Sequence, residues 1–256
     1  MTSSAINATI GGILTIAVRL SGLMLFAPFF GSPAMPARVK AGLVVALTFL
    51  LLPVVGPGIG SYALTDWPLL VLREFLIGAG MGIATNLVFD AVDMAGQIIG
   101  MQMGYSLVNL LDPQTEVNVT VMAVFYRSIV LLLFLMMNVQ YWLLRAIGES
   151  FLYLPPGVGG LRGAFPLGIV KTVGMVFGLG VQIAAPVLAA TLVTDLVLGL
   201  LGKASAQLPL MLLGPAIKSL LGVVILIATL RYWPGLFQRL FERSLENGVR
   251  ILHLAG

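Results

Sequence analysis

Apolar residues run along the chain in six blocks, separated by proline, glycine and polar residues. The blocks cover residues 10–30, 41–55, 69–92, 119–144, 167–201 and 208–230. A helix of about 20 apolar residues crosses the hydrocarbon core of a bilayer. The second block is short, and the fifth is too long and contains Pro186, which is unfavourable inside a helix. We therefore expect an all-α, membrane-type protein of about six apolar helical segments, with broken or hairpin helices among them.

The third block continues into a stretch that is too long for one membrane helix. No proline lies between Pro68 and Pro113, and a straight helix over residues 73–118 would be about 65 Å long, roughly twice a hydrocarbon core. The second half of the stretch mixes methionine and glutamine with glycine. Pro113 ends it, because the residue before a proline is pushed out of the α region. We predict that the stretch bends, breaks or leaves the bilayer.

The last part of the chain has a different pattern. Over residues 235–254 the apolar side chains fall on one helical stripe and the charged side chains on the opposite one. This pattern predicts an amphipathic C-terminal helix that lies on a membrane surface or on a partner.

Composition supports the membrane assignment. The chain is 59% hydrophobic and 9% charged, with a mean hydropathy of +1.06, whereas about a quarter of the residues of soluble proteins are charged. The net charge is +4, but no basic cluster with interleaved aromatics indicates a nucleic-acid partner. The chain has no cysteine and one histidine, His253, so we expect no metal site and no cofactor. The distribution of Lys and Arg between loops favours cytoplasmic termini.

Glycines recur every fourth residue in three places. These are Gly78 and Gly82; Gly96, Gly100 and Gly104; and Gly174 and Gly178. This spacing stacks glycines on one face of a helix and lets another backbone approach closely. Two interpretations are open: ordinary packing within the chain, and contact with other subunits.

Polar residues at membrane depth suggest a second kind of site. Asp90 and Asp93 lie three residues apart, with Gln97 one turn further on. An ionisable residue inside a membrane is a functional candidate by default. A proton-coupled solute transporter could use the two aspartates with Arg127 as counter-ion; a structural ion pair or exposure to an aqueous cavity are the alternatives. An intramembrane enzyme is less well supported, because the single histidine leaves no nucleophile paired with a base.

Methionines follow in the same stretch, at positions 94, 101 and 103. Methionine most often fills gaps in a core. A ring of such side chains from several subunits could instead form a deformable apolar constriction. Met101 and Met103 are therefore candidate pore-lining residues.

Residues 96–107, GQIIGMQMGYSL, closed by Asp112 and Pro113, resemble the signature of the R subunit of the bacterial flagellar export gate, the FliR family, and its injectisome relatives, including the T subunit. Arg19 with the following APFFG, the segment REFLIG from Arg73, and FDAV around Asp90 agree with this resemblance. It extends over essentially the whole chain.

The resemblance implies a non-enzymatic subunit of a type III secretion gate in the inner membrane, at the flagellar basal body. It implies P and Q subunits as partners in the protein-conducting channel, with the B subunit also in contact, and unfolded proteins as the exported substrates. The chain would be one export-gate domain, residues 1–256. Residues 1–160 would correspond to a P-like part and residues 161–233 to a Q-like hairpin.

The resemblance also implies a plug. The family has bulky apolar residues just before the Asp-Pro pair, and these correspond to Leu107 and Leu110. The candidate gate segment comprises Leu107, Val108, Leu110, Leu111, Asp112 and Pro113. Some relatives have phenylalanine at the two leading positions, so leucine keeps the bulk without the ring.

Overall fold

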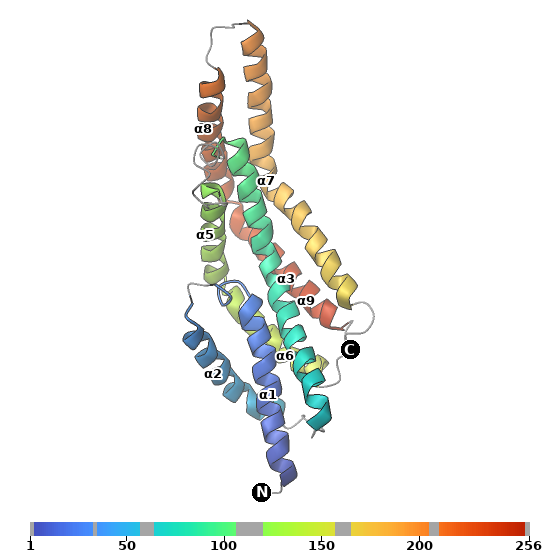
Figure 1. Cartoon of the computed structure of the whole chain (residues 1–256). Coiled ribbons are helices and arrows are strands. Elements are labelled where there is room, and N and C mark those ends of the chain that lie inside the picture. The colour runs from blue at the N-terminus through green and yellow to red at the C-terminus, as the bar shows by residue number, and fades with distance from the viewer. Residues whose placement is uncertain are drawn as a thin grey trace, which may run out of the picture. The chain divides into compact units, whose positions relative to one another are not determined.

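The protein is helical throughout the residues that its computed structural model describes, which are 3–32, 35–56, 64–105, 120–156, 165–204 and 210–253 (Figure 1). The α-helices are α1 Ser3–Phe26, α2 Ala37–Val55, α3 Trp67–Gln102, α5 Val121–Met136, α6 Val139–Tyr153, α7 Phe165–Ala204, α8 Leu210–Leu230 and α9 Trp233–His253; η2, Leu64–Asp66, is a 3-10 helix. The predicted all-α class is therefore confirmed for these residues.

Five of these helices are long and apolar enough to cross a membrane. They are α1, α2, α3, α7 and α8, and α5 with α6 makes a sixth candidate if the two helices form one bent span. This agrees with the predicted number of about six apolar segments, counted over the residues with described positions.

The fourth apolar block is not one helix. The prediction of a single segment over 119–144 is wrong, because α5 ends at Met136, α6 begins at Val139, and the two are bent by 64°. Asn138, between them, has φ 57° and ψ 30°. Asparagine adopts this left-handed conformation more easily than most residues, so the chain turns here without glycine or proline.

The fifth block, by contrast, is one helix. α7 has 40 residues and continues through Pro186, so its length is about 60 Å. Pro53 in α2 and Pro215 in α8 also lie inside helices. Proline within these apolar segments therefore does not mark their ends.

The long stretch after Arg73 breaks, as predicted. α3 has 36 residues and ends at Gln102, and Gly104 has φ 86°, a conformation that is strained for any residue with a side chain. At about 54 Å, α3 is still longer than a hydrocarbon core.

The chain forms two compact units. Unit 1 comprises Met1–Val88, Leu135–Gly174 and Leu240–Gly256, and unit 2 comprises Phe89–Phe134 and Met175–Arg239. Each of α3, α7 and α9 contributes residues to both units. These units describe packing within the chain, and the P-like and Q-like parts remain a prediction from sequence.

Apolar side chains form the core of unit 1. They come from α1, α3 and α6 and include Ile16, Leu20, Leu23, Ile77, Met81, Leu143 and Ile147; Leu43, Leu47 and Leu51 of α2 pack against this core while partly exposed. α2 lies alongside α1 (Figure 1).

The core of unit 2 is aromatic. The rings of Phe89 and Phe134 meet edge to face with centroids 5.7 Å apart. Tyr126 of α5 lies 4.9 Å from Trp233 at the start of α9. Edge-to-face and tilted aromatic pairs stabilise a core beyond the area that they bury.

The apolar stripe of α9 faces the protein itself. Trp233 and Phe237 belong to the core of unit 2, and in unit 1 the Ser244 hydroxyl donates a hydrogen bond to the carbonyl oxygen of Ala84 on α3. The stripe predicted to cover a membrane surface or a partner is thus used for packing within the chain.

Candidate functional site

α1 and α3 cross at unusually short range in unit 1. A Cβ atom at Gly78 would overlap the carbonyl oxygen of Arg19, and one at Gly82 would lie 2.9 Å from the backbone nitrogen of Ala27. Gly22 of α1 faces α3 in the same way. Glycines on both helices thus allow backbone to approach backbone, as small residues do in membrane helix pairs.

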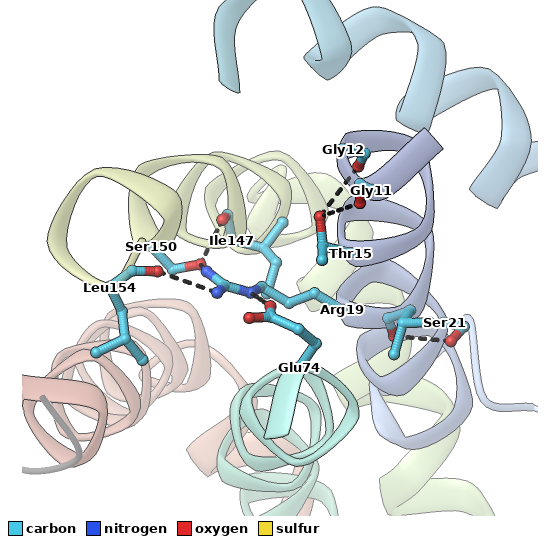
Figure 2. A network of polar contacts seen from close by, with 10 residues as sticks. Gly11, Gly12, Thr15, Arg19, Ser21, Glu74, Ile147, Ser150 and Leu154 are labelled. Atoms are coloured by element: carbon cyan, nitrogen blue, oxygen red, sulfur yellow. Dashed lines mark hydrogen bonds and ion pairs between the residues drawn. The ribbon is translucent and has the colours of Figure 1, made fainter. Parts of the chain in front are cut away.

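A buried ion pair lies one turn from this crossing (Figure 2). The Nε atom of Arg19 donates to Oε2 of Glu74 at 2.6 Å, and the two side chains are 0% and 1% exposed. Arg19 also donates through Nη1 to Oγ of Ser150 and through Nη2 to the carbonyl oxygen of Leu154, each at 3.0 Å. The guanidinium therefore joins α1, α3 and the end of α6 at one buried point.

Arg19 also caps α6. Leu154 follows the last residue of that helix, and Pro155 and Pro156 come next, so the chain after it offers no backbone donor at these positions. The last carbonyl groups of a helix lack partners within it and carry partial negative charge. The positive charge of Arg19 supplies that partner, and its guanidinium lies 4.0 Å from the centre of the Phe151 ring.

The sequence contained a signal for this network that was not interpreted as a site. Arg19 and Glu74 are opposite charges in two different apolar blocks, and charges buried at such depth are paired. Sequence reasoning therefore misses the pair unless the two charges are matched across the blocks.

Five of the regularly spaced glycines contact other parts of the same chain. Gly78 and Gly82 meet α1, as above. In unit 2 a Cβ at Gly96 would overlap the Cα atom of Ala123, one at Gly100 would lie 2.7 Å from Cβ of Thr120, and one at Gly104 would lie 2.9 Å from Cβ of Pro215 on α8. The interpretation as packing within the chain therefore describes these five positions.

Gly174 and Gly178 are different. Among the described residues, nothing lies within 4 Å of a Cβ atom built at either position. The same four-residue spacing thus occurs where α3 packs closely against other helices and where α7 has no neighbour among the described residues.

The candidate gate segment itself lies outside the described residues. This applies to Leu107, Val108, Leu110, Leu111, Asp112 and Pro113. The structure describes the two flanks, which end at Tyr105 and begin again at Thr120.

Both flanks are held near Gly100, in unit 2. The backbone nitrogen of Tyr105 donates to the carbonyl oxygen of Gly100 at 3.0 Å, and its hydroxyl lies 2.7 Å from Oγ of Ser219 on α8. On the return side, Oγ1 of Thr120 donates to the carbonyl oxygen of Gly96 at 3.2 Å, and Thr120 packs on Gly100. Tyr105 and Thr120, the described residues on either side of the candidate gate segment, thus both contact Gly100.

The two candidate pore methionines lie in different surroundings. Met103 is 2% exposed, and its Sδ atom would lie 2.7 Å from a Cβ at Gly222 of α8. Met101 is 58% exposed. Met103 thus fills a gap between helices, whereas the Met101 side chain is exposed.

The polar cluster on α3 is a partly exposed ion pair rather than a buried acidic site. Asp93 forms an ion pair with Arg127 of α5, and their side chains are 26% and 47% exposed. Arg127 lies 5.7 Å from the centre of the Phe89 ring. Of the other residues of the predicted polar cluster, Asp90 is half-buried and Gln97 is exposed. Both the ion-pair interpretation and the transporter hypothesis, in which Arg127 is the counter-ion, include this contact. Among the described positions, no three His, Cys, Asp or Glu residues converge on a possible metal site.

Comparison with known proteins gives consistent matches along the chain. The model of a family described as bacterial export proteins, family 1, matches residues 10–244. The chain is 31% identical over 229 residues to the flagellar biosynthetic protein FliR of Escherichia coli strain K12, covering 88% of this chain and 86% of that protein. It is 30% identical over 229 residues to FliR of Pectobacterium carotovorum, with 90% and 88% covered, and 27% identical over 248 residues to FliR of Bacillus subtilis, with 95% of each covered.

Proposed function

The chain belongs to family 1 of the bacterial export proteins, and from this membership we propose that it is a subunit of the flagellar export apparatus that helps to build a protein-conducting gate. Its relatives with full-length similarity are flagellar biosynthetic proteins. We place it in the bacterial inner membrane at the flagellar basal body. Unfolded flagellar proteins are the substrates that pass.

The observation that carries the gate role is the arrangement at Gly100. Tyr105 and Thr120, the described residues on either side of the gate segment, both contact Gly100, and in our proposal these fixed ends let the segment between them act as a gate without rearrangement of the helices that hold it. Residues 107–111, LVNLL, lie within that segment and are mostly apolar. An apolar constriction excludes water and ions when it is closed. In our proposal Leu107 and Leu110 form the plug, with Met101 near its base.

Exposed apolar surface supports a role within a hetero-oligomer. In the apolar segments Gly174–Ala204 of α7 and Leu213–Leu230 of α8, only 17% of the residues are buried within the chain. Their exposed residues include Leu196, Leu200, Leu220, Val224 and Ile227. Apolar side chains exposed along two whole helices indicate contact with lipid or protein.

A charged pair makes protein the better partner for that surface. Asp195 of α7 forms an ion pair with Lys218 of α8, and the Asp195 side chain is 44% exposed. A half-exposed carboxylate in the middle of an apolar helix pair is costly in lipid and tolerable against protein or water. We propose that the P and Q subunits cover this face, with the B subunit contacting the assembled gate.

Co-purification tests the proposal. We expect the tagged chain, extracted from membranes of a flagellated host in mild detergent, to elute as one large complex with P and Q subunits. A chain that elutes alone, while its relatives' complexes survive the same extraction, would contradict the hypothesis of a gate subunit.

Leakage tests the plug. We expect the double variant Leu107→Ala, Leu110→Ala to make resting cells permeable to small ions, measured as loss of membrane potential or uptake of an otherwise excluded solute. The matched control is Leu107→Phe, Leu110→Phe, which keeps the bulk and should keep the seal. An Ala variant that assembles normally and stays tight would disprove the plug role.

The solute-transporter hypothesis has no support from the family, which consists of bacterial export proteins. The ion pair of Asp93 with Arg127 does not discriminate between the two functions, because the transporter hypothesis also assigns Arg127 as the counter-ion. An enzymatic role likewise has no support from the family.

A further inference from the structure

α2 presents an uninterrupted apolar face to its surroundings. Val45, Phe49, Leu50 and Val54 are 53%, 60%, 68% and 72% exposed. The polar residue Thr48 is 2% exposed and returns its hydroxyl to the carbonyl oxygen of Val44 at 2.7 Å. From Ala41 to Val55, therefore, no polar side chain of α2 points outward.

The ends of this helix have a different character. Arg38 is exposed and Lys40 partly exposed in its first turn. Asp66, in η2 just before α3, is also exposed. α2 has 19 residues, about 28 Å, which is close to the thickness of a hydrocarbon core. Cationic residues at one end of an apolar helix of this length match the headgroup region of an anionic membrane.

The exposed apolar surface of α2 and that of α7 and α8 differ in one respect that decides between lipid and protein. The surface of α7 and α8 contains the ion pair of Asp195, in the last third of α7, with Lys218, near the middle of α8. The outward face of α2 contains no such group. Contact of lipid acyl chains with α2 buries no polar group, whereas their contact with α7 and α8 would place the charges of Asp195 and Lys218 in an apolar environment at a cost in free energy.

We propose that the outward face of α2 contacts lipid acyl chains, and that Arg38 and Lys40 bind anionic phospholipid headgroups. α2 then anchors unit 1 to the bilayer. This proposal does not depend on the gate function, because it rests on α2 and its ends alone.

Site-directed spin labelling tests this contact, and the absence of cysteine from the chain makes each introduced cysteine unique within it. Leu50→Cys is labelled in the full chain, purified from membranes with any subunits that accompany it, and reconstituted into vesicles of phosphatidylethanolamine and phosphatidylglycerol. Collisions with oxygen, which dissolves in acyl chains, are compared with collisions with a water-soluble nickel chelate. The cysteine-free parent provides the background from accompanying subunits.

We expect the label at Leu50 to collide several-fold more often with oxygen than with the chelate. The label at Arg239→Cys, on the exposed polar side of α9, should show the reverse preference. Low collision rates with both reagents at Leu50 would mean that protein covers α2, and a high rate with the chelate would mean that water does. Either result overturns the proposal. If Leu50→Cys fails to accumulate, Val54→Cys probes the same face.

A label at Leu220→Cys on α8, which is 70% exposed, separates this proposal from the gate hypothesis. Low collision rates with both reagents at Leu220, together with more frequent collisions with oxygen than with the chelate at Leu50, support both the gate hypothesis and the α2 proposal. More frequent collisions with oxygen than with the chelate at both positions would support the α2 proposal and contradict the hypothesis that other subunits cover α8.

The headgroup contact has its own test. With the label at Val45→Cys, replacing phosphatidylglycerol by phosphatidylcholine should change the oxygen-to-chelate ratio, because the charges that fix the depth of α2 lose their partner. The double variant Arg38→Gln, Lys40→Gln should remove this dependence on lipid charge. An equal dependence with and without the two charges would exclude the headgroup role.

Discussion

Arg19→Met is expected to destabilise unit 1 by about 3–5 kcal/mol, the usual cost of removing one partner of a buried ion pair. Glu74, which is 1% exposed, would be left as a buried carboxylate with its strongest donor gone. Ser150 and the carbonyl oxygen of Leu154 would lose their donors in the same step. Thermal or denaturant unfolding of the purified chain in detergent measures the loss, and swimming motility provides a cellular readout.

The chain supplies a matched control. Arg145 and Glu149 also form an Arg-Glu ion pair, but their side chains are 80% and 43% exposed, so Arg145→Met should cost far less stability than Arg19→Met. The double variant Arg19→Met, Glu74→Leu should recover much of the lost stability, because it leaves no buried charge. Equal losses for Arg19→Met and Arg145→Met, or no recovery in the double variant, would show that the buried pair does not carry the stability assigned to it.

The helices could be predicted because apolar length is a local property of the sequence. A block such as 208–230 has a long apolar run with turn residues on both sides, and α8 covers nearly the same residues. The break was also predictable in kind, because Gly104 follows α3 closely and glycine disfavours a continued helix, but α3 ends at Gln102, eleven residues before Pro113, where the sequence predicted the end of the stretch.

The bend between α5 and α6 was not predictable in the same way. Residues 137–139 are Met, Asn and Val, and none of them forces a helix to end. Asn138 adopts a left-handed conformation there, which asparagine tolerates but does not require. The packing of α6 in unit 1, including the cap that Arg19 provides, therefore has to be known before the bend can be located.

Partners were harder to predict than burial. The glycine spacing on α3 indicated a close helix contact, and the contact exists, but nothing in the spacing told α1 and α5 apart from a separate subunit. The same limit applies to Arg19, whose partner could not be chosen from the sequence because Glu74 lies far from it along the chain. Pairing depends on which helices cross, and the crossing depends on Gly22 and Gly78 together.

Among the glycines that the structure describes, Gly78→Ala is expected to be the most damaging change to alanine, with a net loss of about 3 kcal/mol, at the upper end of the cost of overpacking. Alanine favours a helix by about 1 kcal/mol over glycine, and this gain is outweighed here. The added methyl group would overlap the carbonyl oxygen of Arg19 and lie 3.0 Å from the backbone nitrogen of Leu23. Since backbone atoms cannot rotate aside, α1 must move away from α3.

That movement connects the two predictions. Displacing α1 lengthens the 2.6 Å contact between Arg19 and Glu74, so Gly78→Ala should damage the ion pair as well as the helix crossing. We therefore expect the losses from Gly78→Ala and Arg19→Met to be less than additive when the changes are combined, as for residues that share one interaction. The control is Gly178→Ala on α7, where a Cβ meets nothing within 4 Å among the described residues, and where the same chemical change should stabilise the helix slightly. Full additivity, or equal effects at Gly78 and Gly178, would separate the glycine crossing from the ion pair and contradict the view that Gly78 holds Arg19 in reach of Glu74.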